Sequence, residues 1–452
     1  MGTIVKIPPD YHKVSFTTRD WSLEGLLKKG KRFFPVPRVS AGSQLEDLLK
    51  PLLQYGRNTI PLVIEDWHKH PDWLGPKLNL EWLKEHGQKD IAVCNIHDWP
   101  DHTVPLEQST QQCHSVSCFV APGETVRWYG KDAECPANWG EWLHNSGVFP
   151  SRLLPDDPRN YLTKLPKHAT VETLMCHLGI GETFMPCHKD LCGSSGHDLM
   201  CYTENDGSSF WFMTKGSDAL EVAKYFCDLE QELDHEMHVI TIEELIRAPF
   251  DVYIMEQKLG DMVLVPPRSC HQVVNSGGIT VKISWSKMTL KGLAIALHYE
   301  LPIYQRVCRC ETYCVKSTIY HSLYQCHMWL ERLLKGFDKL RHIEITANRL
   351  SKLLLLFDYI LMDECPLLEN IQIPTIPCDE DVHVICNFCG ANIFQSFFEC
   401  CTCVHSSSKS STSVPLGSGY ALCSACYSKG RSCRCETMEA VQCQPFKALV
   451  EE

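Results

Sequence analysis

Between about residues 170 and 290, apolar residues recur in short runs, some alternating with polar positions and some unbroken. Gly, Asn, Asp and Pro separate the runs, which are VETLMCHLGI, SSFWFMT, FDVYIMEQ, DMVLVPP, HQVVN and ITVKISW. A period of two is typical of strands, and those four residue types end strands at turns. Many short strands closed by turns predict a double-sheet jelly roll.

Helical patterns flank and interrupt this β region. Before it, TIPLVIEDW (59–67) predicts a strand, and LNLEWLKEHGQKDIAVCNI (78–96) predicts a helix, a Gly stop and a strand. Within it, 217–233 predicts an inserted helix with Ser217 or Asp218 as its N-cap. After it, from about 291 to 362, apolar residues recur at three- and four-residue steps, so helices are expected there.

Composition narrows the class of protein. The chain has 452 residues with 44% hydrophobic and 22% charged residues, as in soluble globular proteins. No apolar run is long enough for a membrane span, so LSKLLLLFDYILM (350–362) is expected to be a core helix. The N-terminus lacks the apolar core of a signal peptide. The net charge of −12 argues against general DNA binding and suits a partner with a basic peptide segment.

Cysteine usage indicates metal binding. The chain has 26 cysteines and no expected secretion signal, so clustered cysteines are better explained by metal than by disulfides. Four cysteine pairs follow residue 381, and eight thiolates can hold two zinc ions. The expected zinc ligands are Cys386, Cys389, Cys400, Cys403, Cys423, Cys426, Cys433 and Cys435. The three cysteines of CRCETYC (308–314) lack an evident fourth ligand, and Cys187, Cys192 and Cys201 are expected to be buried thiols.

A second metal site is predicted within the β region. If the stretch MPCHKDL is extended, His188 and Asp190 point to the same face because strand side chains alternate. His271, which opens a strand after a Pro-Pro turn, can supply a third ligand. Two histidines and one carboxylate form the facial triad of non-haem Fe(II) oxygenases. His197 and Asp198 follow GSSG, so they are expected in a turn, near the pocket mouth.

From about 55 to 300 the chain resembles the JmjC-domain Fe(II)/2-oxoglutarate dioxygenases. The stretches that carry the resemblance are IPLVIEDW, IAVCNI, WYGKDAECP, HKD, SSFWFMT, GDMVLVPPRSCHQVVN and ITVKISW. The resemblance implies a double-stranded β-helix, with His188, Asp190 and His271 as iron ligands and 2-oxoglutarate as cosubstrate. CNFCGANIFQSFFECCTC…YALCSACYSKG resembles ZZ-like fingers. It implies cross-bracing, in which cysteine pairs one and three share one zinc, and pairs two and four share the other.

The cosubstrate residues follow the family pattern less closely. Many members place a lysine just before the aromatic strand, where this chain has Ser209. Many also carry threonine three residues before the first iron ligand; here Thr183 lies two residues earlier than that. Lys282 parallels a lysine in IKVAEDF, the corresponding stretch of the H3-lysine-9 demethylase subfamily. Ser284 shares its face, and Lys282 could alternatively be an exposed barrel lysine.

Together the motifs imply a histone lysine demethylase with Fe(II), 2-oxoglutarate and Zn(II), whose HxD motif and zinc module resemble the H3-lysine-9 subfamily. Such enzymes release formaldehyde, succinate and CO2. A protein hydroxylase with the same iron site and an inactive chromatin-binding JmjC protein are the alternatives. The expected partners are a histone tail or another basic methylated peptide, and chromatin, with no membrane and no indicated direct DNA contact; the expected location is the nucleus.

The expected fold is mainly β with α. It comprises an N-terminal α/β lead-in (1–100), a JmjC jelly roll or cupin domain (101–300), a helical extension (301–365), a linker (366–381) and a small zinc-binding module (382–445).

Overall fold

The computed structural model describes residues 17–42, 45–99, 101–336, 340–364, 373–375, 384–400, 402–403, 419–445 and 449. These residues group into two compact units. Unit 1 comprises the described parts of Met1–Pro155, Thr173–Lys189 and Gly196–Ser286. Unit 2 comprises those of Asp156–Glu172, Asp190–Ser195 and Lys287–Glu452. Of the predicted linker, only 373–375 is described, so the predicted domain boundaries stay predictions.

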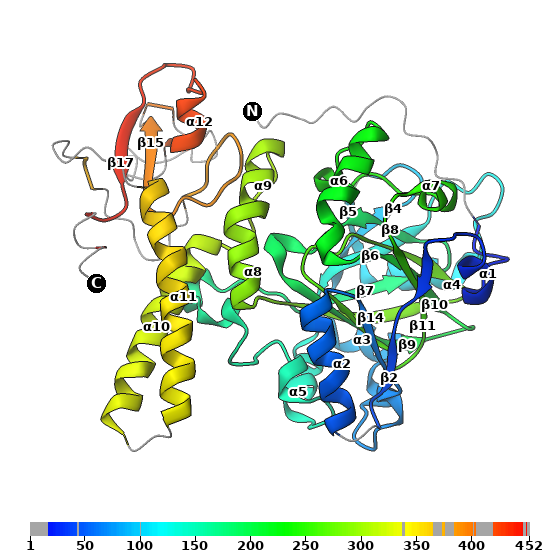
Figure 1. Cartoon of the computed structure of the whole chain (residues 1–452). Helices are drawn as coiled ribbons and strands as arrows, with labels where there is room; N and C mark the ends of the chain where they lie inside the picture. The colour runs from blue at the N-terminus through cyan, green and yellow to red at the C-terminus, as the bar shows by residue number, and fades with distance from the viewer. Residues whose placement is uncertain are drawn as a thin grey trace. The chain divides into compact units, whose positions relative to one another are not determined.

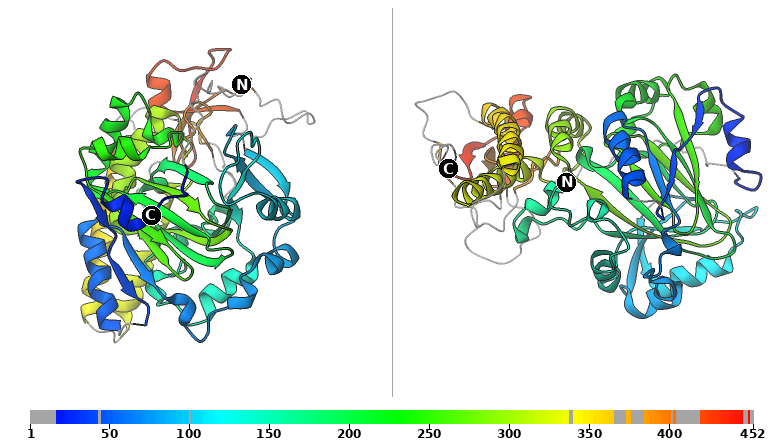
Figure 2. Two further views of the ribbon diagram at one scale, coloured as in Figure 1. Left: turned by 90° about the vertical axis from the view of Figure 1, so that its right-hand side faces the viewer. Right: turned by 60° about the horizontal axis from the view of Figure 1, so that its bottom comes forward.

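Two β-sheets form the core of unit 1 (Figures 1 and 2). The five-stranded sheet contains β1 (Phe33–Pro35), β11 (Val252–Gln257), β10 (Ser208–Met213), β13 (His271–Ser276) and β8 (Phe184–His188), in that order. The nine-stranded sheet contains β2 (Arg38–Ser40), β3 (Leu62–Glu65), β12 (Met262–Val265), β9 (Ser195–Thr203), β14 (Thr280–Lys287), β7 (Met175–Gly179), β6 (Trp128–Glu134), β4 (Asp90–Asn95) and β5 (Asp101–Pro105).

The strand order confirms the predicted jelly roll. Along β7–β10, and again along β11–β14, consecutive strands alternate between the two sheets, as in a double-stranded β-helix. Alternation along β10 separates two cores. Phe210 and Phe212 pack with the inserted helix, whereas Trp211 and Met213 pack with β12 and β13. The apolar run SSFWFMT is therefore covered on both faces.

Seven helices are described around these sheets. The two that were predicted in this region, within 78–96 and at 217–233, lie where they were expected. They are α1 (Leu23–Leu27), α2 (Leu45–Asn58), α3 (Leu80–His86), α4 (Leu106–Ser115), α5 (Ala137–Asn145), α6 (Ala219–Asp228) and α7 (Ile242–Arg247). Asn79 caps α3 by accepting a hydrogen bond from the Trp82 amide at 2.8 Å, and the helix ends at Gly87. The inserted helix α6 is shorter than predicted, and its N-cap Asp218 makes no side-chain capping bond.

The prediction that His197 and Asp198 lie in a turn is wrong. Strand β9 starts at Ser195, pairs with β12, and contains both residues, which are 5% and 8% exposed. The polar GSSG stretch resembles a turn because sequence alone does not show the long-range pairing that extends it. His197 stacks on Trp285 with ring centroids 5.4 Å apart, so neither residue lies at a pocket mouth as an exposed turn residue.

Unit 2 contains a helical core and a cysteine-rich module. The helices are α8 (Leu290–Ile295), α9 (Leu301–Val307), α10 (Val315–Lys335) and α11 (Leu340–Glu364), with a π-helical turn at Ala296–Glu300. Helices α10 and α11 lie side by side in Figure 1. The predicted core helix is part of α11 and buries Leu353, Leu356, Phe357 and Ile360. None of the described helices has the length and apolar character needed to cross a bilayer.

Two carboxylates, one half-buried and one buried, join the cysteine module to these helices. The module holds the sheet β16 (Tyr420–Cys423), β15 (Ser396–Cys400) and β17 (Glu439–Gln442), with α12 (Ser424–Ser428). Glu311 accepts hydrogen bonds from the amides of Val315 (2.7 Å) and Asn392 (3.2 Å). Glu364 accepts one from the Ser396 amide at 3.0 Å. These contacts make the module part of unit 2.

Candidate functional site

Three predicted metal ligands come together at the ends of two paired strands. His188 is the last residue of β8, His271 is the first of β13, and the two face each other in the antiparallel register. Asp190 follows two residues after His188, as the N-cap of a short 3-10 turn. One ligand atom from each residue lies within 4.8 Å of the others. This spacing suits a single ion.

Backbone contacts select the tautomer of both histidines. His188 Nδ1 lies 2.8 Å from Pro186 O, and His271 Nδ1 lies 3.0 Å from Ser269 O. A carbonyl only accepts hydrogen bonds, so each Nδ1 carries the proton. The Nε2 lone pair of each ring is then available to a metal, which is the usual outer-shell arrangement of metal-binding histidines. Two imidazoles and one carboxylate fit Fe(II), with coordination positions left for other ligands.

Lys282 lies inside the barrel, not on its surface. It is 2% exposed on β14, and its ammonium lies 5.7 Å from the ring centroid of Trp211, which in turn stacks on His271 at 5.8 Å. Burial lowers the pKa of Lys282, and the nearby charge of Asp198 opposes that shift. Among the described residues Lys282 forms no salt bridge, so a buried cation near the iron ligands can accept a carboxylate.

A polar chain fixes the groups around Lys282. Trp211 donates through Nε1 to Gln257 at 2.9 Å, and the Gln257 amide donates to Asp198 Oδ1 at 2.8 Å. The indole beneath Lys282 and the carboxylate beside it are thus held by one side chain. Gln257 is fully buried, so these bonds are made away from water.

Ser284 contacts a second buried histidine. His177 Nδ1 accepts a hydrogen bond from the Asp132 amide at 3.4 Å, so Nε2 carries the proton and donates to Ser284 Oγ at 2.7 Å. Burial lowers the pKa of His177, which keeps the ring neutral. Tyr129 stacks against His177 with centroids 6.4 Å apart, and burial raises the pKa of its hydroxyl far above the ordinary value. His177 is opposite Lys282 in the strand register.

Thr183 and Ser209 meet at a residue that the sequence analysis did not single out. The Asn275 amide donates to Thr183 Oγ1 at 2.8 Å, and Ser209 Oγ donates to Asn275 Oδ1 at 2.7 Å. All three side chains are buried. Their hydrogen bonds tie β10 and the residue just before β8 to β13, so both hydroxyls already have protein partners. Their predicted contact with cosubstrate stays a prediction.

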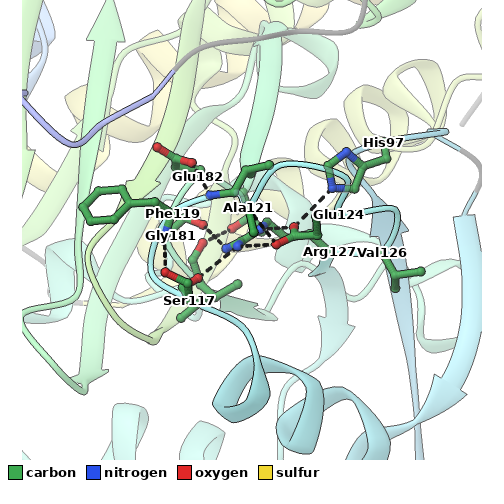
Figure 3. A network of polar contacts seen from close by, with 12 residues as sticks. His97, Ser117, Phe119, Ala121, Glu124, Val126, Arg127, Gly181 and Glu182 are labelled. Carbon is green, nitrogen blue, oxygen red and sulfur yellow. Dashed lines mark hydrogen bonds and ion pairs between the residues drawn. The ribbon is translucent and has the colours of Figure 1, made fainter.

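A buried arginine anchors the turn that leads into β8 (Figure 3). Arg127 is fully buried and donates to both carboxylate oxygens of Glu124, at 2.6 and 2.9 Å. It also donates to the carbonyls of Gly181 (2.6 Å) and Ser117 (2.9 Å). All of these Arg127 donors reach protein acceptors, so the network is a structural brace that holds the turn before β8.

Glu182, which follows Gly181 in the sequence, stabilises the same turn. It has φ +62°, an uncommon backbone conformation for a residue with a side chain. Its carboxylate accepts hydrogen bonds from the amides of Thr18 (2.8 Å) and Val120 (2.5 Å). These bonds offset the strained conformation and hold the segment just before β8.

The cysteine module forms two four-thiol groups with the cross-braced pairing that the ZZ-like resemblance implied. One contains Cys386, Cys389, Cys423 and Cys426, and the other contains Cys400, Cys403, Cys433 and Cys435. Both fit tetrahedral Zn(II). Gln305 of α9 donates to Cys423 Sγ at 3.4 Å, and the Thr437 hydroxyl, 3.3 Å from Cys400 Sγ, lowers the pKa of Cys400 to about 6.

The other cysteine motifs join no metal group among the described residues. Cys187, Cys192 and Cys201 are buried, as expected, and burial raises the pKa of each thiol. In CRCETYC, Cys308 and Cys310 are exposed. The motif instead supplies Glu311, whose amide donates to Gly390 O at 3.1 Å. No disulfide joins the described cysteines.

Comparisons with known proteins agree with this geometry. Residues 175–286, which include all three triad residues and Lys282, match the family model described as JmjC domain, hydroxylase. C-module-binding factor A of Dictyostelium discoideum is 29% identical over 328 residues. The match covers 68% of this chain but only 31% of that protein, so the chain spans about a third of its relative's length. Residues 175–286 are therefore similar to the JmjC hydroxylase family and include a His–Asp–His site that fits iron.

Proposed function

We propose that this protein is an Fe(II)/2-oxoglutarate-dependent oxygenase that demethylates methyl-lysine on histones. The observation that carries the proposal is the buried Lys282 beside the His188–Asp190–His271 group, because it pairs a metal triad with a cation for a carboxylate. Iron, 2-oxoglutarate and O2, when bound, would supply the chemistry that hydroxylates a C–H bond: one oxygen atom of O2 enters the product and the other enters succinate, with release of CO2. A hydroxylated N-methyl group loses formaldehyde.

The chain's own residues hold and orient these groups. The two Nε2 atoms and the Asp190 carboxylate bind the metal, and Lys282 binds the far carboxylate of 2-oxoglutarate. Tyr129 and Ser284 lie against His177, the residue opposite Lys282, and offer hydroxyls to the same carboxylate. Trp211 contacts both the Lys282 ammonium and the His271 ring, so it connects the two parts of the proposed site.

The histone substrate rests on charge and on the motif resemblance. A net charge of −12 favours a basic peptide over nucleic acid. The HxD triad and a two-zinc module accompany each other in the H3-lysine-9 subfamily that the sequence resembles. Chromatin as partner and the nucleus as location follow from that substrate and belong to the same proposal.

Mass spectrometry of methylated histone peptides with the purified protein, iron and 2-oxoglutarate tests the proposal. Demethylation predicts peptides lighter by one CH2 for each methyl group removed, with formaldehyde and succinate in equal amounts. His188→Ala is the control, and turnover that survives this change would contradict the ligand assignment. An unmethylated peptide serves as the substrate control.

Two other functions have specific support. The family model's description as a hydroxylase favours a protein hydroxylase with the same metal site. A peptide heavier by one oxygen, without formaldehyde, would replace the demethylase proposal with this one. The relative's name describes a binding factor, which favours a binding role, and a catalytically inactive chromatin-binding protein is the alternative of that class. Failure to bind both iron and 2-oxoglutarate would leave only that function.

A further inference from the structure

The segment between α6 and α7 contacts both strands that carry the histidine ligands, β8 and β13. It lies on the face away from the metal, where Leu233, Val239 and Ile240 pack with the outward residues of β8, β10 and β13. His188 and His271 point inward, so their sequence neighbours point outward to this segment. The segment is therefore placed to fix the spacing of the two ligand-bearing strand ends.

Three polar contacts join this segment to the residues next to His188 and His271. Lys189, between His188 and Asp190 in sequence, forms an ion pair with Asp234 at 3.1 Å, and their side chains are 3% and 2% exposed. The Cys187 amide donates to His238 O at 3.0 Å, on the other side of His188.

The third contact holds the partner strand. Gln272, which follows His271, accepts a hydrogen bond from the Ile240 amide at 2.8 Å and donates to the Ile240 carbonyl at 3.0 Å. A side-chain amide that makes both bonds is fixed in position and angle, and both residues are buried. Each histidine ligand thus has a neighbour held by the same ten-residue stretch, 232–241.

We propose that the Lys189–Asp234 ion pair positions the metal ligands and thereby sets the metal affinity of the site. The inference rests on the proposed iron site. The pair does not contact the metal; it fixes the backbone on which His188 and Asp190 stand. A buried ion pair is costly to separate, so it restricts the movement of both charged groups more than apolar packing does. Loss of the pair lets the HKD segment move, so the three ligand atoms no longer converge.

Mn(II) binding to the zinc-loaded full chain, followed by EPR of free Mn(II), tests this. Mn(II) favours carboxylate and imidazole ligands over thiolates, so the cysteine groups do not compete for it. Lys189→Met and Asp234→Asn should each weaken Mn(II) binding about 10- to 100-fold, as changes of outer-shell partners typically do. Lys189→Arg, which can keep the ion pair, should retain most of the affinity.

A matched control separates positioning from general loss of stability. Lys287 and Asp157 form another buried ion pair, 2.9 Å apart with side chains 8% and 5% exposed, and both belong to unit 2. Lys287→Met should lower the thermal midpoint and leave Mn(II) affinity within twofold of wild type. Equal weakening by Lys287→Met would overturn the inference, because any destabilisation would then suffice.

A double variant covers the case in which single variants do not fold. Lys189→Met with Asp234→Leu removes both charges, so no unpaired charge remains buried. It should fold and still bind Mn(II) more weakly than wild type. Wild-type affinity in this variant, or in Lys189→Met, refutes the positioning role. Absence of Mn(II) binding in the wild type instead refutes the proposed iron site, so the two failures are distinguishable.

Discussion

Replacing Arg127 by methionine should destabilise unit 1 strongly. The guanidinium is fully buried and makes four hydrogen bonds of 2.6–2.9 Å, two to Glu124 and two to backbone carbonyls (Figure 3). Arg127→Met keeps the apolar stem and leaves the Glu124 carboxylate, 11% exposed, without its main partner. Breaking a buried ion pair from one side costs about 3–5 kcal/mol, and we expect a loss of that size.

Urea unfolding followed by tryptophan fluorescence measures this loss in the right part of the chain. Of the 11 tryptophans, all except Trp329 belong to unit 1, so the signal reports that unit. Arg19→Met is the matched control: Arg19 is exposed and its guanidinium lies 4.6 Å from the Phe119 ring centroid. A contact of that kind contributes about 0.5–1 kcal/mol.

The pH dependence gives a second check of the same reasoning. Burial alone would raise the pKa of Glu124, but hydrogen bonds from Arg127 and His97 outweigh it and hold the pKa below the usual 4.5. A lowered carboxyl pKa contributes stability above pH 4.5 that is lost as the pH falls through the folded-state pKa. Arg127→Met should flatten this acid dependence. A loss below about 1 kcal/mol with unchanged acid dependence would refute the brace, because exposed ion pairs contribute that little.

Three further predictions concern the candidate sites. Lys282→Met should raise the 2-oxoglutarate concentration for half-maximal binding about 10- to 100-fold, since a hydrogen bond to a charged group contributes about 1.5–3 kcal/mol; titration calorimetry measures it, and an unchanged affinity contradicts the assignment. Asp198→Asn removes the charge that opposes the effect of burial, so the pKa of Lys282 falls further. As the pH rises, the variant should therefore lose 2-oxoglutarate binding at a lower pH than the wild type does, which the same titration across pH checks. Cys386→Ser should reduce the zinc content from two ions to one per chain by elemental analysis, while Cys443→Ser, outside both four-thiol groups, should keep two.

The sequence predicted the elements that depend on local pattern. Short apolar or alternating runs located β10–β14, and Gly87 ended α3 as predicted, whereas Asn79 was not predicted as its N-cap. The ligand pair His188 and Asp190 was recognisable because i, i+2 spacing predicts a shared face in an extended stretch, although β8 ends at His188 and Asp190 lies just beyond it.

The surroundings of residues that depend on long-range pairing were not recognisable. Alternation in ITVKISW places Lys282 and Ser284 on one face, but only the pairing of β14 with β7 shows that this face is the barrel interior. The same holds for Asn275 and Gln257, whose roles arise from partners far away in sequence. His197 and Asp198 were misplaced for this reason too, since the pairing with β12 extends the strand through them.

In this barrel, the partners of buried polar side chains distinguish residues that stabilise the fold from residues that form the candidate site. Arg127, Asn275 and Gln257 are buried, and their donors reach protein acceptors, which is the state that stabilises a fold. Lys282 is equally buried, yet its described neighbours are an aromatic ring and a carboxylate beyond ion-pair distance. Burying a cation this way costs stability unless another anion completes its surroundings. Its position near His271 is the reason that 2-oxoglutarate is proposed as that anion.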